Sequence, residues 1–268
     1  MHSCIPFIGL FYFMNTNLPA YRVVNNDFTE PPGKLGLLYG EHGVYSTATL
    51  VAAEIIRYQS PVVFVDGANR VDPYYLARLA RYTGFAPHTF LNRAFVSRAF
   101  TCYQMDVALT DGLLEYMQSV NSRVLLIYGP IDLFDDEQVT MRDIVDMIRR
   151  IHLAFELLKR HHISTMLVSK TPHFQMKGRE RLLLQFKEMS DVIYRLESYD
   201  TMQHIIMEKV PYGTNSTNSN ALDSARRGKL VEIPAGAQER GSRYTRQIIS
   251  RCQTAASGNF HGSAADTV

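Results

Sequence analysis

Between residues 35 and 210 the chain alternates short apolar runs with longer amphipathic segments, and this alternation limits its fold more than any other feature. The runs at residues 61–66 and 123–128 are apolar almost throughout, which is typical of strands buried on both faces of a parallel sheet. Residues 137–161 instead place isoleucine, phenylalanine and leucine on one stripe, as an amphipathic helix does. Strands that alternate with helices of this length indicate βαβ units. We therefore predict an α/β domain in which helices cover both faces of a mostly parallel sheet.

The pattern predicts individual elements as well. Strands are expected at residues 35–39, 61–66, 93–97, 123–128, 163–169, 191–196 and 203–209, the last two forming a closing pair. Helices are expected at residues 47–58, 73–83, 102–117 and 137–161. The start of the second helix is marked most clearly, because Asp72 can cap it and Pro73 fits its first turn.

The length of 268 residues fits one domain with extensions. We assign residues 1–30 to an N-terminal extension, 31–212 to the core domain and 213–268 to a polar, low-complexity tail that we expect to be mostly disordered. Residues 226–251 of the tail hold seven Lys or Arg and two Glu. This excess of positive charge would bind nucleic acid or an acidic partner weakly. The alternative is an ordinary solvated tail.

Bulk composition excludes several classes of protein. A formal charge of +2 does not by itself indicate nucleic-acid binding, and the three cysteines form no C-x-x-C pair, so neither a disulfide framework nor a metal site is predicted. We therefore expect the protein to reside in a reducing compartment, the cytoplasm or the nucleus.

The apolar run at residues 4–13 is too short to span a bilayer and no cation precedes it, so we expect no membrane anchor or secretory signal. It is expected to be a packed strand or the product of an upstream start codon.

A loop after the first predicted strand has the outline of a phosphate-binding loop, G-x-x-x-x-G-K-[ST]. Gly40 and Thr47 stand at the ends of that pattern. Tyr45 occupies the second glycine position and Ser46 occupies the lysine position. The loop therefore lacks the glycine that lets the backbone approach a phosphate closely, and the cation that would bind it. The alternative is an ordinary strand and helix joined by a glycine-containing loop. The candidate loop consists of Gly40, Glu41, His42, Gly43, Val44, Tyr45, Ser46 and Thr47.

Several further segments occur in the order found in a known family. Residues 64–73 read FVDGANRVDP, a strand with an acidic end followed by an Asp-Pro helix start, and residues 95–100 read FVSRAF, with Gln104 downstream. Residues 123–134 place an apolar strand before Ile-Asp-Leu-Phe, and residues 190–197 look like a late strand. Together they resemble the ATPase core of the RecA-type recombinases, especially the archaeal and eukaryotic recombinase paralogues. The resemblance covers about two-thirds of the chain and implies a RecA-like core of the P-loop NTPase superfamily.

The departures from that family concern its chemistry. The resemblance implies ATP and Mg²⁺ as cofactors, yet Ser46 replaces the lysine, Ala68 the catalytic glutamate and Tyr128 the metal-binding aspartate. Residues 169–172 contain no glutamine to sense the γ-phosphate. Because phosphoryl transfer depends on positioning and charge stabilisation, we expect negligible ATPase activity.

Three residues still fall near the place that the resemblance gives to the nucleotide: Thr47, Asp66 and Lys170. Lys170 is either a substitute phosphate ligand or an exposed lysine at a strand end.

In the segment that corresponds to the second DNA-binding loop of the family, this chain keeps a cluster of basic residues. That cluster would contact phosphates without sequence preference, or it is the solvated face of a short helix. Its candidate DNA contacts are Lys177, Arg179 and Arg181.

The sequence thus predicts a catalytically degenerate protein, similar to a recombinase paralogue, that acts by binding a partner in DNA recombination or repair. The expected partners are a RecA-like or other repair protein and single-stranded DNA. Two alternatives stay open: a P-loop NTPase with an atypical but functional ATP site, and a regulatory or structural subunit unrelated to DNA.

Overall fold

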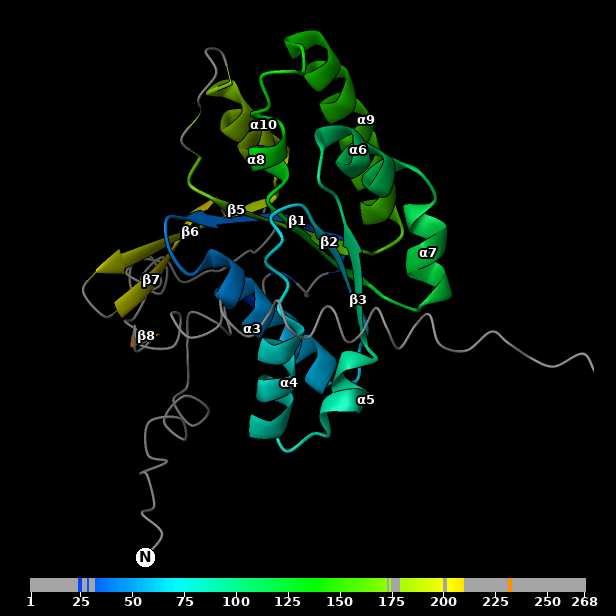
Figure 1. Cartoon of the computed structure of the whole chain (residues 1–268), viewed down its shortest axis with the longest axis vertical. Coiled ribbons are helices and arrows are strands. Elements are labelled where there is room, and N and C mark those ends of the chain that lie inside the picture. The colour runs from blue at the N-terminus through cyan, green and yellow to red at the C-terminus, as the bar shows by residue number, and fades with distance from the viewer. Residues whose placement is uncertain are drawn as a thin grey trace, which may run out of the picture. The chain divides into compact units, whose positions relative to one another are not determined.

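A computed structural model describes residues 24, 25, 28, 32–172, 174, 179–199, 202–209 and 231–232 (Figure 1). The chain divides into two units, residues 1–231 and 232–268, and the fold below is that of the first. The predicted disordered tail, its basic stretch and the apolar run at residues 4–13 lie outside the described residues, apart from a two-residue strand, β8 (Val231–Glu232).

One sheet forms the centre of the first unit. Its strands follow the order β3-β2-β4-β5-β1-β6-β7. All neighbouring pairs up to β6 are parallel, and only β6 and β7 run antiparallel. The strands are β1 (Leu35–Gly40), β2 (Val62–Asp66), β3 (Ala94–Arg98), β4 (Val124–Tyr128), β5 (Ser164–Lys170), β6 (Val192–Tyr199) and β7 (Met202–Lys209). The predicted mostly parallel sheet is therefore confirmed.

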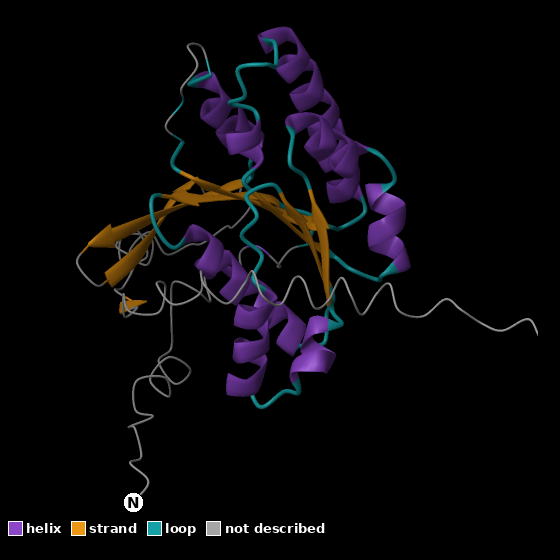
Figure 2. Ribbon diagram, in the orientation of Figure 1, coloured by secondary structure: helices purple, strands orange, loops and turns teal. Residues whose placement is uncertain are grey.

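Helices cover both faces of the sheet, as Figure 2 shows. One face carries α3 (Val44–Arg57), α4 (Pro73–Tyr82) and α5 (Pro87–Leu91). The other carries α6 (Cys102–Thr110), α7 (Leu113–Ser119), α8 (Pro130–Leu133), α9 (Met141–Arg160) and α10 (Arg181–Met189). This layered α/β architecture is compatible with a RecA-like fold. None of the helices that the structure describes combines the length and the apolar composition needed to cross a bilayer.

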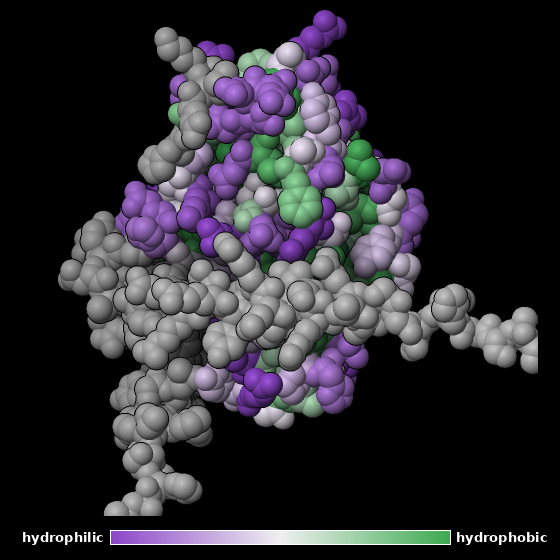
Figure 3. All heavy atoms as spheres, viewed as in Figure 1, coloured by the Kyte–Doolittle hydropathy of each residue, from purple (hydrophilic) through white to green (hydrophobic). Residues whose placement is uncertain are grey.

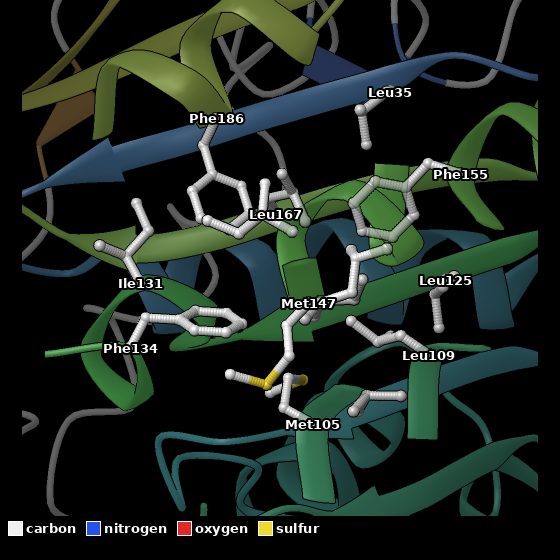
Figure 4. Packing of buried hydrophobic residues seen from close by; sticks show 14 of the residues in the cluster. Leu35, Met105, Leu109, Leu125, Ile131, Phe134, Met147, Phe155, Leu167 and Phe186 are labelled. Atoms are coloured by element: carbon white, nitrogen blue, oxygen red, sulfur yellow. The ribbon is translucent and has the colours of Figure 1, made fainter. Parts of the chain in front are cut away.

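The sheet separates two hydrophobic cores, because successive residues of a strand point to opposite faces. Along β1, Leu35, Leu37 and Tyr39 contribute to the core beneath α6, α9 and α10, and Leu38 contributes to the core on the α3 side. Figure 4 shows the first core, where Phe155 of α9 packs near the sheet. Burial on both faces explains why the strands are continuously apolar in sequence.

The start of α4 is as predicted. Asp72 caps the helix, with its carboxylate accepting a hydrogen bond of 2.8 Å from the amide of Tyr74, and Pro73 is the first helical residue. The single helix predicted at residues 102–117 is wrong, because Gly112 adopts a left-handed conformation (φ 68°) and separates α6 from α7. Two short helices that begin at proline, α5 and α8, were not predicted.

Candidate nucleotide site at the carboxyl edge of the sheet

The predicted nucleotide residues do meet at one edge of the sheet. Gly40, at the end of β1, lies opposite Lys170 of β5, and Asp66, at the end of β2, lies opposite Tyr128 of β4. In open α/β sheets, ligands bind outside this carboxyl edge. The fold therefore brings the candidate residues to the place where a nucleotide site would be expected.

The loop itself runs from Gly40 to the start of α3. Gly43 is left-handed (φ 76°), and its carbonyl accepts a bond of 2.9 Å from the amide of Thr47, so α3 begins three residues earlier than predicted. Unpaired amides and the helix dipole make such a helix N-terminus attractive to anions. Ser46, Glu41 and His42 are exposed, and none of the three supplies the cation that the lysine of the pattern would provide.

Gly40 has a packing reason to be glycine. A Cβ at this position would lie 2.2 Å from the carbonyl oxygen of Leu196 on β6, closer than real Cβ atoms come. The close approach of β6 thus accounts for the first glycine of the pattern without any phosphate.

The second glycine position is filled by the side chain of Tyr45, which is buried at the first turn of α3. Its ring centroid lies 5.3 Å from that of Tyr128, which is fully buried at the end of β4. The hydroxyl oxygens of Tyr128 and Thr49 are 3.0 Å apart, and the Thr49 hydroxyl also donates to the carbonyl of Tyr45 at 2.7 Å. We call Tyr45, Thr49 and Tyr128 the tyrosine cluster. Two of its members, Tyr45 and Tyr128, occupy the positions at which the sequence resemblance would place a phosphate-loop glycine and a metal-binding carboxylate.

Burial governs the protonation of the cluster. Desolvation raises the pKa of both Tyr45 and Tyr128 far above that of free tyrosine, so both phenols stay neutral. A neutral phenol does not replace the aspartate as a magnesium ligand, because Mg²⁺ is bound mainly through carboxylate and phosphate oxygens.

Asp132 of α8 adds a carboxylate to this edge. It belongs to the Ile-Asp-Leu-Phe segment of the resemblance, but no role in the site was predicted for it. Its Oδ2 accepts a bond of 3.4 Å from the Tyr45 hydroxyl. Asp132 is exposed as a residue, but partial desolvation of its carboxyl group raises its pKa, and the nearby charge of exposed Lys170 acts in the opposite direction. A turn at Gly129, which has a φ of 64°, brings α8 and Asp132 back over the sheet edge.

Asp66 is occupied within its own turn. It is buried, and its two carboxylate oxygens accept bonds of 3.0 Å from the amide of Arg70 and 2.9 Å from the amide of Val71. These bonds hold the turn between β2 and α4. The structure therefore gives Asp66 a structural role where the sequence suggested a residual nucleotide contact.

The expected basic cluster is not a continuous exposed surface. Arg179 is buried, and its guanidinium donates to the carbonyls of Asp136 at 3.0 Å and Val139 at 2.6 Å, and to that of Phe134. It therefore holds the loop before α9, and the prediction of an Arg179–DNA contact is corrected on this ground. Arg181 is exposed at the start of α10, and Lys177 lies outside the described residues.

Within the described part of the chain, no group of three or more His, Cys, Asp or Glu side chains is arranged to hold a metal ion. Comparison with known proteins found no family model that matches the chain and no curated protein whose sequence matches it. The site must therefore be interpreted from its own geometry.

Proposed function

We propose that the protein is a catalytically degenerate, RecA-like protein that acts by binding a partner protein or DNA in recombination or repair, without turning over ATP. The tyrosine cluster carries this proposal. In place of a glycine that allows close backbone approach and a charged metal ligand, it has two neutral, buried tyrosines whose rings are in contact. Thr49 joins them by hydrogen bonds to the Tyr128 hydroxyl and to the backbone carbonyl of Tyr45. Without the cation and the metal-binding carboxylate, the edge has lost the groups that stabilise charge in phosphoryl transfer.

The outer strand of the sheet, β3, supports a role in protein binding. Among the described strands, β3 pairs only with β2, so one row of its backbone amides and carbonyls is open. Exposed apolar side chains flank it: Val96 in the strand is 42% exposed, and Phe100 just after it is 67% exposed. An open strand edge beside exposed apolar groups is a surface to which an extended segment of another protein can add.

The first experiment is the melting temperature of the full chain with and without saturating Mg²⁺-ATP, together with an assay of phosphate release. We expect no shift and no hydrolysis above that of a Thr47→Ala variant. A ligand that binds only the folded state must raise the melting temperature, so a clear rise that Thr47→Ala abolishes would favour the NTPase with an atypical site.

The second experiment measures binding to a purified RecA-type recombinase. Val96→Arg and Phe100→Ala should weaken binding, and Leu153→Ala, which removes an equally exposed apolar side chain on α9, should leave it unchanged. If the wild-type chain binds neither a recombinase nor DNA, the role in recombination is wrong, and the regulatory subunit unrelated to DNA takes its place.

A further inference from the structure

The segment that follows β2 and runs to the end of β3 has an unusual charge composition for this chain. Residues 67–98 contain five arginines, no lysine and a single acidic residue, Asp72, although the whole chain has a net charge of only +2. The carboxylate of Asp72 is engaged in capping α4. The positive charge of this segment was not part of the expected DNA contacts.

Helix α4 gathers part of this charge on one face. Tyr74, Arg78, Arg81 and Tyr82 follow the spacing i, i+4, i+7 and i+8, which places them on one side of a helix. All four are exposed, and Tyr74 and Tyr82 are 52% and 44% exposed. We call these four residues the α4 stripe. The opposite side of the helix, which includes Leu76 and Leu79, is buried.

The arginines of the α4 stripe are not neutralised by neighbours in the described part of the chain. Neither Arg78 nor Arg81 forms an ion pair with a carboxylate there. The guanidinium of Arg78 lies 5.5 Å from the ring centroid of Tyr75, a cation–π contact that orients it without cancelling its charge. Arg70, just before the helix, is exposed as well.

This combination fits single-stranded nucleic acid better than a protein partner. Non-specific single-strand binding joins a positive surface that follows the backbone with aromatic rings on which bases stack. Along α4 a ligand meets a tyrosine, a guanidinium and a second tyrosine within about 12 Å of helix. The stripe contains no aliphatic side chain, and the exposed aliphatic groups lie elsewhere, for example Val96 on β3. In the lower part of Figure 3, the surface of the segment that holds α4 and α5 has hydrophilic groups on both sides of a smaller hydrophobic area.

We propose that the α4 stripe binds single-stranded DNA, with Arg78 and Arg81 contacting phosphates and Tyr74 and Tyr82 stacking on bases. The choice of DNA rests on the proposed function. The surface itself is independent of the tyrosine cluster and of the basic cluster that the sequence suggested near α10.

The test is binding of a fluorescein-labelled oligothymidine to the full chain, followed by fluorescence anisotropy over a range of salt concentrations. Each lost phosphate contact should reduce the slope of log K against log salt by about 0.7 for a single strand, so Arg78→Ala/Arg81→Ala should reduce it by about 1.4. Tyr74→Ala/Tyr82→Ala should weaken binding by about tenfold or more, because each stacked base contributes substantially. Tyr74→Phe/Tyr82→Phe keeps the rings and should bind like the wild type.

Arg142→Ala/Arg149→Ala is the matched control, since it removes two exposed arginines from α9. The melting temperature of each variant shows that it has folded. The proposal is overturned if the wild type does not bind at low salt, or if the control loses as much affinity as Arg78→Ala/Arg81→Ala. It is also overturned if polyglutamate competes as well as unlabelled oligothymidine, which would indicate an acidic protein partner, or if oligouridine binds more tightly. None of these results depends on the nucleotide assay, so failure here leaves the absence of ATP turnover to be judged separately.

Discussion

The hydroxyl oxygens of Tyr128 and Thr49 lie 3.0 Å apart inside the protein, at the edge of the sheet where a metal-binding carboxylate would be expected. Thr49 reaches back to the carbonyl of Tyr45 at 2.7 Å, and the ring of Phe64 meets that of Tyr128 edge-on at 5.8 Å between centroids. The end of β4 is thus packed as core. A residue that functions here as a packing element should respond to substitution as a core residue does.

Replacement of Tyr128 tests this directly. Tyr128→Phe keeps the ring and loses only the contacts of the hydroxyl, with Thr49 at 3.0 Å and with the Tyr45 carbonyl at 3.4 Å, so it should lower the free energy of unfolding by about 1 kcal/mol. Tyr128→Asp creates a cavity and buries an unpaired charge, and should cost about 4 kcal/mol or more. Urea denaturation followed by circular dichroism measures both. If Tyr128→Asp were as stable as the wild type and gained stability from Mg²⁺-ATP, the edge would be a nucleotide-binding site in which Tyr128 takes the place of a metal ligand.

Arg179 should matter for stability and not for DNA. Its buried guanidinium satisfies carbonyls of the loop at residues 134–139, so Arg179→Ala leaves buried acceptors without a donor and should cost on the order of 2–3 kcal/mol. Arg181→Ala, two residues along and exposed, should stay within about 0.5 kcal/mol of the wild type. Urea denaturation gives both values. Equal costs for the two variants would show that the contacts of Arg179 contribute little.

The importance of Gly40 can be separated from nucleotide binding. Gly40→Ala would bring a Cβ to 2.2 Å from the Leu196 carbonyl, so β1 and β6 would have to separate, at a cost of about 1–3 kcal/mol. Gly36 lies in the same strand, where a Cβ would come no closer than 3.4 Å to Val192, and Gly36→Ala is the matched control. Thermal unfolding without nucleotide should show a lower melting temperature for Gly40→Ala alone. A loss seen only with nucleotide present would instead assign Gly40 to a phosphate loop.

The general architecture was predictable because it depends on periodicity. Continuous apolar runs identified the parallel strands, and the pair Asp72 and Pro73 marked the start of α4 by local capping chemistry alone. The break at Gly112 was harder to find, because a single glycine within an apolar pattern is compatible with a continuous helix. Boundaries were displaced for a related reason: α3 begins at Val44, where a left-handed Gly43 and not a side-chain cap starts the helix.

The candidate site was only partly predictable. The alignment of Gly40, Asp66, Tyr128 and Lys170 along one edge follows from the parallel sheet and could be foreseen. The role of each side chain could not be predicted, because it depends on contacts between residues distant in sequence, such as those between Tyr45 and Tyr128. The same limit applies to Arg179, since nothing in a run of charged residues shows that one of them turns inward to the carbonyl of Val139.

A final prediction concerns acid stability. Burial alone would raise the pKa of Glu208 on β7, but hydrogen bonds from Lys187 at 2.9 Å and Tyr39 at 2.8 Å, with the charge of Arg195, lower it below the ordinary value. A carboxylate with a lower pKa in the folded state stabilises the fold above the pKa of the unfolded chain. That stabilisation is lost as the pH falls through the folded pKa.

The measurement is the free energy of unfolding of the wild type and of Glu208→Gln at a series of pH values. The wild type should be the more stable near neutral pH, by less than about 1 kcal/mol because the network is partly exposed to solvent. The difference should shrink on acidification below about pH 4, the ordinary range for glutamate. Glu137→Gln, at an exposed carboxylate between α8 and α9, controls for the loss of one surface charge. A difference that stayed constant with pH would show that Glu208 contributes packing and not charge to the junction of α10 with the sheet.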